Sequence, residues 1–172
     1  MSNFDVITKN IQTGDILLSR KPGSKISEII QGVTRSKWSH SFLYIGENKI
    51  IESGWDGVVI RHLADYFNGK YELGLFRVQP ELTVDEQSKL VKTARKMLGI
   101  HYGFLQLLWG AILRLFGKSE DPDWNINMSK GMICSEMMAR AFKRINRPIK
   151  DLPPAQMEPV DFDDSSATIR IA

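Results

Sequence analysis

A change of pattern near residue 80 constrains the fold of this 172-residue chain more than any other feature. Residues 13–79 contain short runs of β-branched and aromatic residues that are separated by turn residues, a pattern typical of strands. From residue 82 onward, apolar residues recur at the three- and four-residue spacing of helices. The sequence therefore predicts an α+β fold, in one domain that covers residues 1–172.

The expected elements follow from hydrophobic periodicity and from turn residues. Strands are expected at residues 13–20, 38–46, 49–53 and 71–79, and a short strand that passes into a short helix is expected at 57–67. Helices are expected within 21–37 and at 82–99, 103–116 and 132–146, and the mostly irregular tail leaves room for one last strand. The helix at 82–99 has the clearest boundaries. Thr83 and Glu86 form a capping-box pattern at its start, and Gly99 suits its end.

The composition excludes several classes of function. The net charge is only +3, and no basic stripe is interleaved with aromatic residues, so we expect no nucleic-acid partner. The single cysteine excludes an intramolecular disulfide and a cysteine-based zinc cluster. We expect neither a metal nor a cofactor.

Two segments bear on membranes. The N-terminus lacks a basic start followed by an apolar stretch, so we expect no signal peptide and a cytoplasmic protein. The most apolar segment, "FLQLLWGAILRLF" at 104–116, is too short to span a bilayer and contains Arg114. Two interpretations of residues 103–116 stay open, a buried core helix and a peripheral membrane contact.

The only cysteine, Cys134, stands in "KGMICSEMMARAF" near the start of the helix expected at 132–146. A lone cysteine is most often a small buried apolar residue. In the first turn of a helix, however, the unpaired backbone N–H groups and the helix dipole stabilise a thiolate. The same N–H groups could hold an oxyanion during acyl transfer. Cys134 is thus either a core thiol or a nucleophile.

A thiol nucleophile needs a base, normally a histidine, and the base needs an orienting partner. Of the three histidines, His40 lies in the expected strand "WSHSFLYIG" among apolar neighbours. An imidazole in that setting requires hydrogen-bond partners, which favours either a structural network or a site. His62 and His101 are expected to lie nearer the surface.

The turn between the strands at 38–46 and 49–53 decides which carboxylate meets His40. With a three-residue loop from Gly46 to Asn48, and Asn48 in the left-handed conformation, Ile45 pairs with Lys49 and Phe42 with Glu52. Glu52 is then the same-face diagonal neighbour of His40, about 7–8 Å away between backbones. A two-residue loop would place Glu52 on the opposite face, where it would be a solvated charge at a strand end.

Four short motifs resemble one family when they are taken in order. "GDILLSR", "SHSFLYIG", "IIES" and "CSEMMARAF" are similar to segments of the circularly permuted papain-like cysteine hydrolases, the YaeF/YiiX-type branch of the NlpC-like superfamily. The resemblance covers about residues 13–160 and includes "EPVDF" after the cysteine helix. It implies a papain-like domain whose antiparallel sheet packs against helices. Permutation explains the order His40, Glu52, Cys134, and order is no obstacle because such sites are defined by geometry.

The resemblance also implies roles for particular residues. Cys134 would be the nucleophile, His40 the general base and acid, and Glu52 the residue that orients His40. Tyr102 in "LGIHYGF" matches a tyrosine of the family and would line the pocket or help bind the oxyanion. Trp38 and Ser39, next to His40, are expected to contact substrate.

The function implied is a thiol hydrolase that cleaves an amide of peptide or isopeptide type through an acyl-enzyme. One alternative keeps the chemistry but acts on acyl lipids, as in relatives of the lecithin:retinol acyltransferase type, and the apolar segment 103–116 suits it. The cysteine stretch of those relatives usually reads Asn-Cys-Glu, whereas this chain has Cys-Ser-Glu. A second alternative is a catalytically silent binding module of the same fold. The partner expected is therefore a peptide-like or acyl-lipid substrate.

Overall fold

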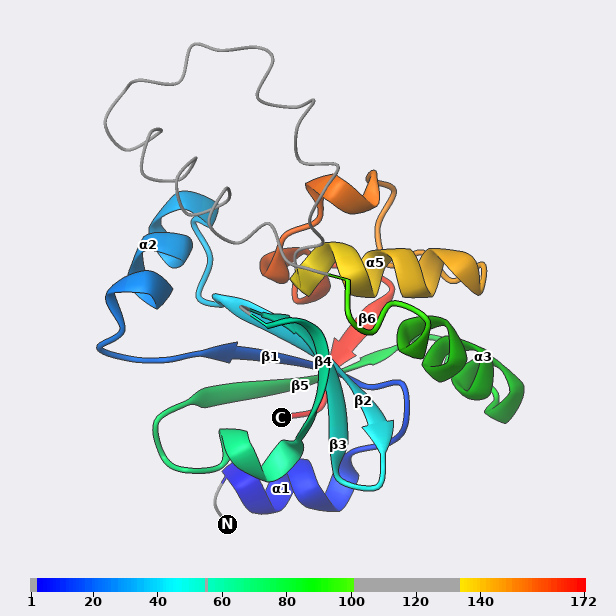
Figure 1. Cartoon of the computed structure of the whole chain (residues 1–172), viewed down its shortest axis with the longest axis horizontal. Coiled ribbons are helices and arrows are strands. Elements are labelled where there is room, and N and C mark those ends of the chain that lie inside the picture. Colours follow the sequence, from blue (N-terminus) through cyan, green and yellow to red (C-terminus); the bar gives the residue numbers. More distant parts are fainter. Residues whose placement is uncertain (1–2, 55, 101–133) are drawn as a thin grey trace, which may run out of the picture.

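The computed structural model describes residues 3–54, 56–100 and 134–172, which form a six-stranded sheet with helices on both faces (Figure 1). The strands are β1 (Ile16–Arg20), β2 (His40–Gly46), β3 (Lys49–Gly54), β4 (Gly57–His62), β5 (Glu72–Val78) and β6 (Thr168–Arg170). The α-helices are α1 (Asn3–Asn10), α2 (Lys25–Thr34), α3 (Val84–Arg95) and α5 (Cys134–Arg144). The 3₁₀ helices are η1 (Leu63–Tyr66), η4 (Pro154–Gln156) and η5 (Pro159–Phe162). The order across the sheet is β4-β3-β2-β1-β5-β6, and every neighbouring pair is antiparallel.

Alternating side chains of the central strands build two hydrophobic clusters, one on each face of the sheet. Leu43 of β2 belongs to the cluster under α3 and α5, together with Leu90 and Met137 of those helices. Phe42, the preceding residue, belongs to the cluster that includes Ile7 of α1. The sheet is therefore buried on both faces, and α1 and η1 lie opposite α3 and α5 in Figure 1.

The structure confirms the strands expected in the first half and the α+β class. It also confirms the capping box of α3, in which Thr83 and Glu86 each bond the backbone of the other. Helix α3 ends earlier than expected, at Arg95, and Gly99 follows in a turn with φ of 79°. Helix α1 was not predicted. The helix expected at 103–116 lies outside the described residues.

The β2–β3 hairpin has the predicted register at the end that carries His40 and Glu52, but its turn differs from the prediction. Phe42 pairs with Glu52 as expected, and Asn48 is left-handed with φ of 55°. The expected pairing of Ile45 with Lys49 is wrong, because Gly46 pairs with Lys49 and leaves a two-residue turn. A β-bulge between Tyr44 and Gly46 absorbs the extra residue, so the parity of the strand is restored before Phe42.

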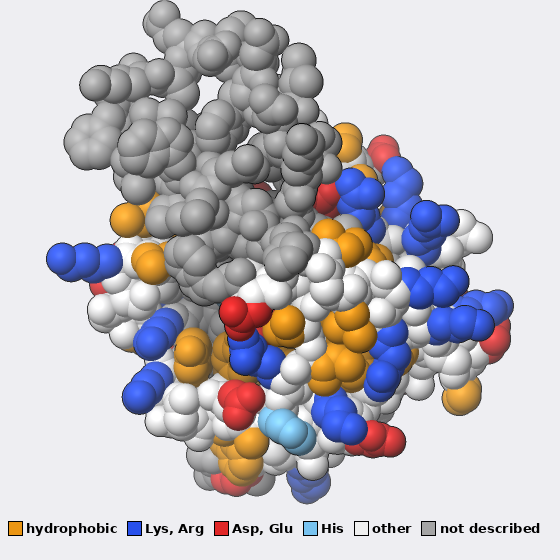
Figure 2. All heavy atoms as spheres, in the orientation of Figure 1, with side chains coloured by type: hydrophobic (Ala, Val, Ile, Leu, Met, Phe, Trp, Pro, Cys, Tyr) orange, Lys and Arg blue, Asp and Glu red, His pale blue; other side chains and the backbone are white. Residues whose placement is uncertain are grey.

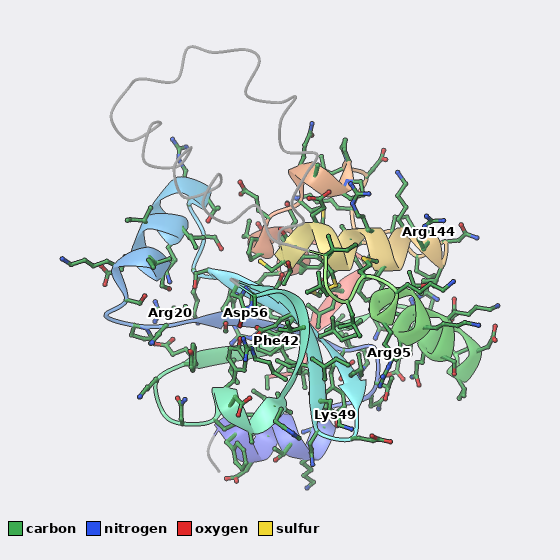
Figure 3. All side chains as sticks on the ribbon, in the orientation of Figure 1. Arg20, Phe42, Lys49, Asp56, Arg95 and Arg144 are labelled. Carbon is green, nitrogen blue, oxygen red and sulfur yellow. The ribbon has the colours of Figure 1, made fainter. Side chains whose placement is uncertain are left out.

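The hairpin carries its site residues at the end opposite the turn. In Figure 3 it runs from its tip, marked by Lys49, past Phe42 toward Asp56. His40 begins β2 and Glu52 lies near the end of β3, so both stand far from the turn. Among the described residues, no helix is both long and apolar enough to cross a bilayer.

Candidate active site

Helix α5 meets strand β2 where the strand begins. Cys134 is the first residue of α5 and is only 6% exposed, and His40 is the first residue of β2. Cys134 and His40 interact directly, and each shifts the pKa of the other. Because Glu52 pairs with Phe42, its side chain shares a face with His40, and Nε2 of His40 lies 2.7 Å from Oε2 of Glu52. The structure thus brings together the three residues that the sequence singled out.

The Cys134 thiol is held in a setting that favours the thiolate. Burial raises its pKa, but the adjacent His40, followed by the backbone N–H of Ser41, outweighs burial and lowers the pKa below its ordinary value. The charges of α5 follow its dipole, with Glu136 in the first turn and Lys143 and Arg144 in the last. Lys and Arg side chains accordingly gather over the far end of α5 and over α3 (Figure 2).

His40 is held as an imidazolium. Burial lowers its pKa, yet the charge and hydrogen bond of Cys134 and the bond to Glu52 raise it to about 10. Since Nε2 is bonded to Glu52, Nδ1 is the ring nitrogen left for Cys134. A raised imidazole pKa and a lowered thiol pKa together describe a thiolate–imidazolium pair, which is a nucleophile with its proton donor already beside it.

Glu52 is a buried carboxylate that receives three side-chain donors. His40 and Tyr66 bond Oε2, and Nε of Arg61 bonds Oε1 at 2.6 Å. Burial raises the pKa of Glu52, but the bonds from His40, Tyr66 and Arg61 prevail and lower it to about 2. The carboxylate is therefore ionised throughout the pH range in which His40 titrates.

The sequence reasoning missed Tyr66 and Arg61. Arg61 was within its reach, because Glu52 pairs with Val59, and Arg61 is then the same-face diagonal neighbour of Glu52 on β4. The rule that linked His40 to Glu52 on one side links Arg61 to it on the other. Tyr66 comes from η1, which folds back over the sheet, and no local pattern marks that contact.

The remaining predicted site residues are placed differently. Trp38 is 1% exposed, and its indole N–H donates to Asp163 at 2.7 Å, so it packs in the core. The hydroxyl of Ser39 accepts from Ser27 at 2.8 Å and links α2 to the start of β2. Contact of Trp38 and Ser39 with substrate stays a prediction. Tyr102 lies outside the described residues.

The fold and the site define a papain-like α+β protein with a thiol, an imidazole and a carboxylate in one connected group. Residues 10–169 match the family described as permuted papain-like amidase enzyme, YaeF/YiiX, C92 family, and the chain belongs to this family. The fold is similar to the crystal structure of metalloprotein yiiX from Escherichia coli O157:H7, with a TM-score of 0.66 and 21% sequence identity. That likeness covers 94% of this chain and 96% of the yiiX chain. No protein matched in the search of curated sequences.

Proposed function

We propose that this protein is a thiol hydrolase that cleaves an amide bond of peptide or isopeptide type. The observation that carries the proposal is that His40 is bonded to Glu52 through Nε2 and also interacts with Cys134. Membership of an amidase family supports an amide rather than an ester as the bond attacked. Acyl-lipid hydrolysis would use the same residues, so it serves as a comparison in the test below.

The reaction begins with the Cys134 thiolate, whose sulfur adds to the carbonyl carbon and turns the carbonyl oxygen into an oxyanion. His40 then donates its Nδ1 proton to the leaving amine as the C–N bond breaks, which leaves a thioester on Cys134. Neutral His40 next takes a proton from water, and the hydroxide displaces the thiolate from the acyl carbon. The acid is released, and the thiolate–imidazolium pair is restored.

Glu52 makes no bond to the substrate in these steps. It keeps the proton of the neutral imidazole on Nε2, so Nδ1 faces Cys134 as a base, and it stabilises the imidazolium before and after each transfer. Because Glu52 is buried and ionised, its effect on His40 is stronger than that of a solvated carboxylate.

A metal does not fit these residues. The yiiX protein, whose fold is similar, is called a metalloprotein. Here the described residues include no cluster of three or more His, Cys, Asp or Glu side chains that could hold a metal ion. A cation at Glu52 would also have to displace the guanidinium of Arg61, 2.6 Å from Oε1. The proposed steps use only the protein side chains and water.

The test is a hydrolysis screen over peptide, isopeptide and phospholipid substrates with matched variants. Cys134→Ala and His40→Ala should each lower turnover by about a thousandfold or more, because one removes the attacking atom and the other the proton carrier. His62→Ala is the control, since His62 is exposed and pairs with Lys49 beside the hairpin turn.

Iodoacetamide labelling gives a second readout that needs no substrate. The wild-type thiol should be labelled rapidly at neutral pH, and His40→Ala should slow the labelling. Equal labelling rates in wild type and His40→Ala would overturn the proposal. So would hydrolysis that survives Cys134→Ala.

A further inference from the structure

The carboxylate of Glu52 has more partners than an orienting residue needs. One bond to His40 would fix the tautomer, yet Tyr66 shares Oε2 with His40, and Arg61 occupies Oε1. The Glu52 side chain is only 5% exposed, so these donors replace most of its water. The two extra donors come from different elements, β4 and η1, that frame the β3 strand end.

We propose that Tyr66 and Arg61 are positioning residues that keep Glu52 ionised and turned toward His40, and that they thereby set the lowest pH at which the Cys134–His40 pair persists. The inference deepens the proposed function and rests on it. Neither residue is assigned a bond to substrate.

Tyr66 suits this role because its hydroxyl stays protonated near neutral pH and can therefore donate a hydrogen bond to the carboxylate. Burial and the charge of Glu52 raise its pKa far above the ordinary value, so the hydroxyl keeps its proton. Its ring packs on Phe42 with centroids 4.4 Å apart, and Phe42 is the cross-strand partner of Glu52. The hydroxyl is therefore held over Oε2 by the same strand pair that aligns His40 with Glu52.

Arg61 fixes the other oxygen. Its Nε bonds Oε1 at 2.6 Å, while its Nη2 bonds Asp56 at 2.7 Å, so the guanidinium is held from both sides. With Oε1 engaged, the carboxylate cannot rotate without breaking a charged bond, and Oε2 stays toward the imidazole. Arg61 is 42% exposed, and water screens part of its charge, so we expect its effect to be smaller than that of Tyr66.

The charged and titratable groups around Glu52 determine in which direction its pKa moves when a donor is removed. His40 faces it from β2, Arg61 from β4 and Tyr66 from η1, with Cys134 beyond His40 and Asp56 beyond Arg61. Loss of Tyr66 or Arg61 removes a donor to the anion, so the pKa of Glu52 rises. When Glu52 protonates, the imidazolium loses its counter-ion, and the thiolate in turn loses the imidazolium.

The experiment is the rate of iodoacetamide labelling of the full chain, measured from about pH 2 to about pH 9 so that the range includes protonation of Glu52, whose pKa is about 2. The acidic limb of this profile reports protonation of the thiolate. It should move upward by about one pH unit in Tyr66→Phe and by less in Arg61→Gln. Labelling near the acidic midpoint should then fall several-fold, while the rate near pH 8 changes little.

Two matched controls separate positioning from general disturbance. Tyr71→Phe removes the same hydroxyl from a ring 4.8 Å from that of Tyr66, and Asp56→Asn removes only the outer partner of Arg61. Neither should move the acidic limb by more than a small fraction of the Tyr66→Phe shift. Arg61→Lys should restore part of the Arg61→Gln shift, because it returns the charge but not the Nε bond.

An acidic limb that coincides with wild type in folded Tyr66→Phe and Arg61→Gln would overturn this inference. Circular dichroism establishes folding, and should Tyr66→Phe fail to fold, Arg61→Gln decides alone, because that side chain is partly in solvent. Failure of the proposed function looks different. In that case His40→Ala itself leaves labelling unchanged.

Discussion

Two buried carboxylates, Glu52 in β3 and Asp15 beside the sheet, have pKa values that are shifted in opposite directions. Asp15, which precedes β1, is 2% exposed. It accepts two hydrogen bonds of 2.8 Å from Arg77 and one of 2.7 Å from the backbone N–H of Gln12. Its pKa is nevertheless raised, because burial outweighs those bonds. Glu52 is 4% exposed, and there the three side-chain donors outweigh burial and lower the pKa to about 2.

The difference lies in what each carboxylate is paired with. Arg77 is permanently charged and largely buried, at 12% exposed, and it also bonds the carbonyl of Asn10 at the end of α1. The Asp15–Arg77 pair therefore joins β1, β5 and α1, and its arginine has no proton to exchange near neutral pH. Glu52 faces His40, whose charge changes in the proposed reaction. We infer that a fixed pair serves the fold and a titrating pair serves the chemistry, although both are buried ion pairs.

Amide substitution at the two positions should separate these roles, and the largest effect is expected from Glu52→Gln. All three donors point at the carboxylate, but an amide has one oxygen and one NH₂ group, so one donor must face the NH₂. If the oxygen turns to Arg61, the NH₂ faces His40 and imposes the wrong tautomer. We expect hydrolysis to fall by about a hundredfold and still exceed that of Cys134→Ala. The measurement is turnover of the substrate found in the screen.

Removing Arg61 as well offers a test of this explanation. In the double variant Glu52→Gln/Arg61→Gln the amide oxygen is free to face His40, so turnover should recover in part relative to the single variant. A single variant as active as wild type would show that Glu52 does not orient His40. No recovery in the double variant would show that the tautomer is not the cause.

The second largest effect is on stability, from Asp15→Asn. This change leaves the buried guanidinium of Arg77 with only the exposed carboxylate of Glu81, 3.7 Å away, and we expect a loss of about 2–3 kcal/mol in the free energy of unfolding. Iodoacetamide labelling of Cys134 should be unchanged. Glu52→Gln should also lose about 2–3 kcal/mol at neutral pH, because the ionised carboxylate of Glu52 stabilises the fold, but this variant should slow the labelling as well. Urea denaturation checks the two stability losses, and slowed labelling in Asp15→Asn would erase the distinction between the two pairs.

The smallest effect is on the pH dependence of stability. The pKa of Glu52 is lowered from 4.5 to about 2, so its contribution is fully present above about pH 4.5 and is lost as the pH falls toward 2. The stability difference between wild type and Glu52→Gln should therefore shift in favour of the variant by about 1–2 kcal/mol from pH 5 to pH 3. The contribution of Asp15 to stability depends on pH in the opposite direction.

The pKa of Asp15 is raised above 3.8, so its favourable contribution is present below that pH and is lost as the pH rises through the folded-state value. The gap between wild type and Asp15→Asn should thus widen at acid pH. Urea denaturation of the three proteins at about pH 3, 4 and 5 supplies both comparisons. Parallel curves for the two variants would mean that the carboxylates do not differ in the way described.

Local patterns were enough to predict the strands, the capping box of α3 and the meeting of His40 with Glu52, because strand parity and capping depend on near neighbours. The prediction of the turn was wrong in detail. Both a three-residue loop and a two-residue turn with a bulge place Phe42 opposite Glu52, so strand parity does not distinguish them. The meeting of Cys134 with His40 joins residues distant in sequence, and only the family resemblance indicated it. Tyr66 was missed because its contact arises from the way η1 packs over the sheet.

The bulge near Ile45 also determines which changes in chain length this hairpin can accept. Removing Ile45 would let Gly46 follow Tyr44 directly, with Phe42 still opposite Glu52, so His40 would keep its face. Inserting one residue between Phe42 and Tyr44 would turn His40 to the other face of the sheet. Exposed turns usually tolerate insertions and deletions. In this hairpin, the position of the added or lost residue relative to the bulge decides whether a functional protein remains.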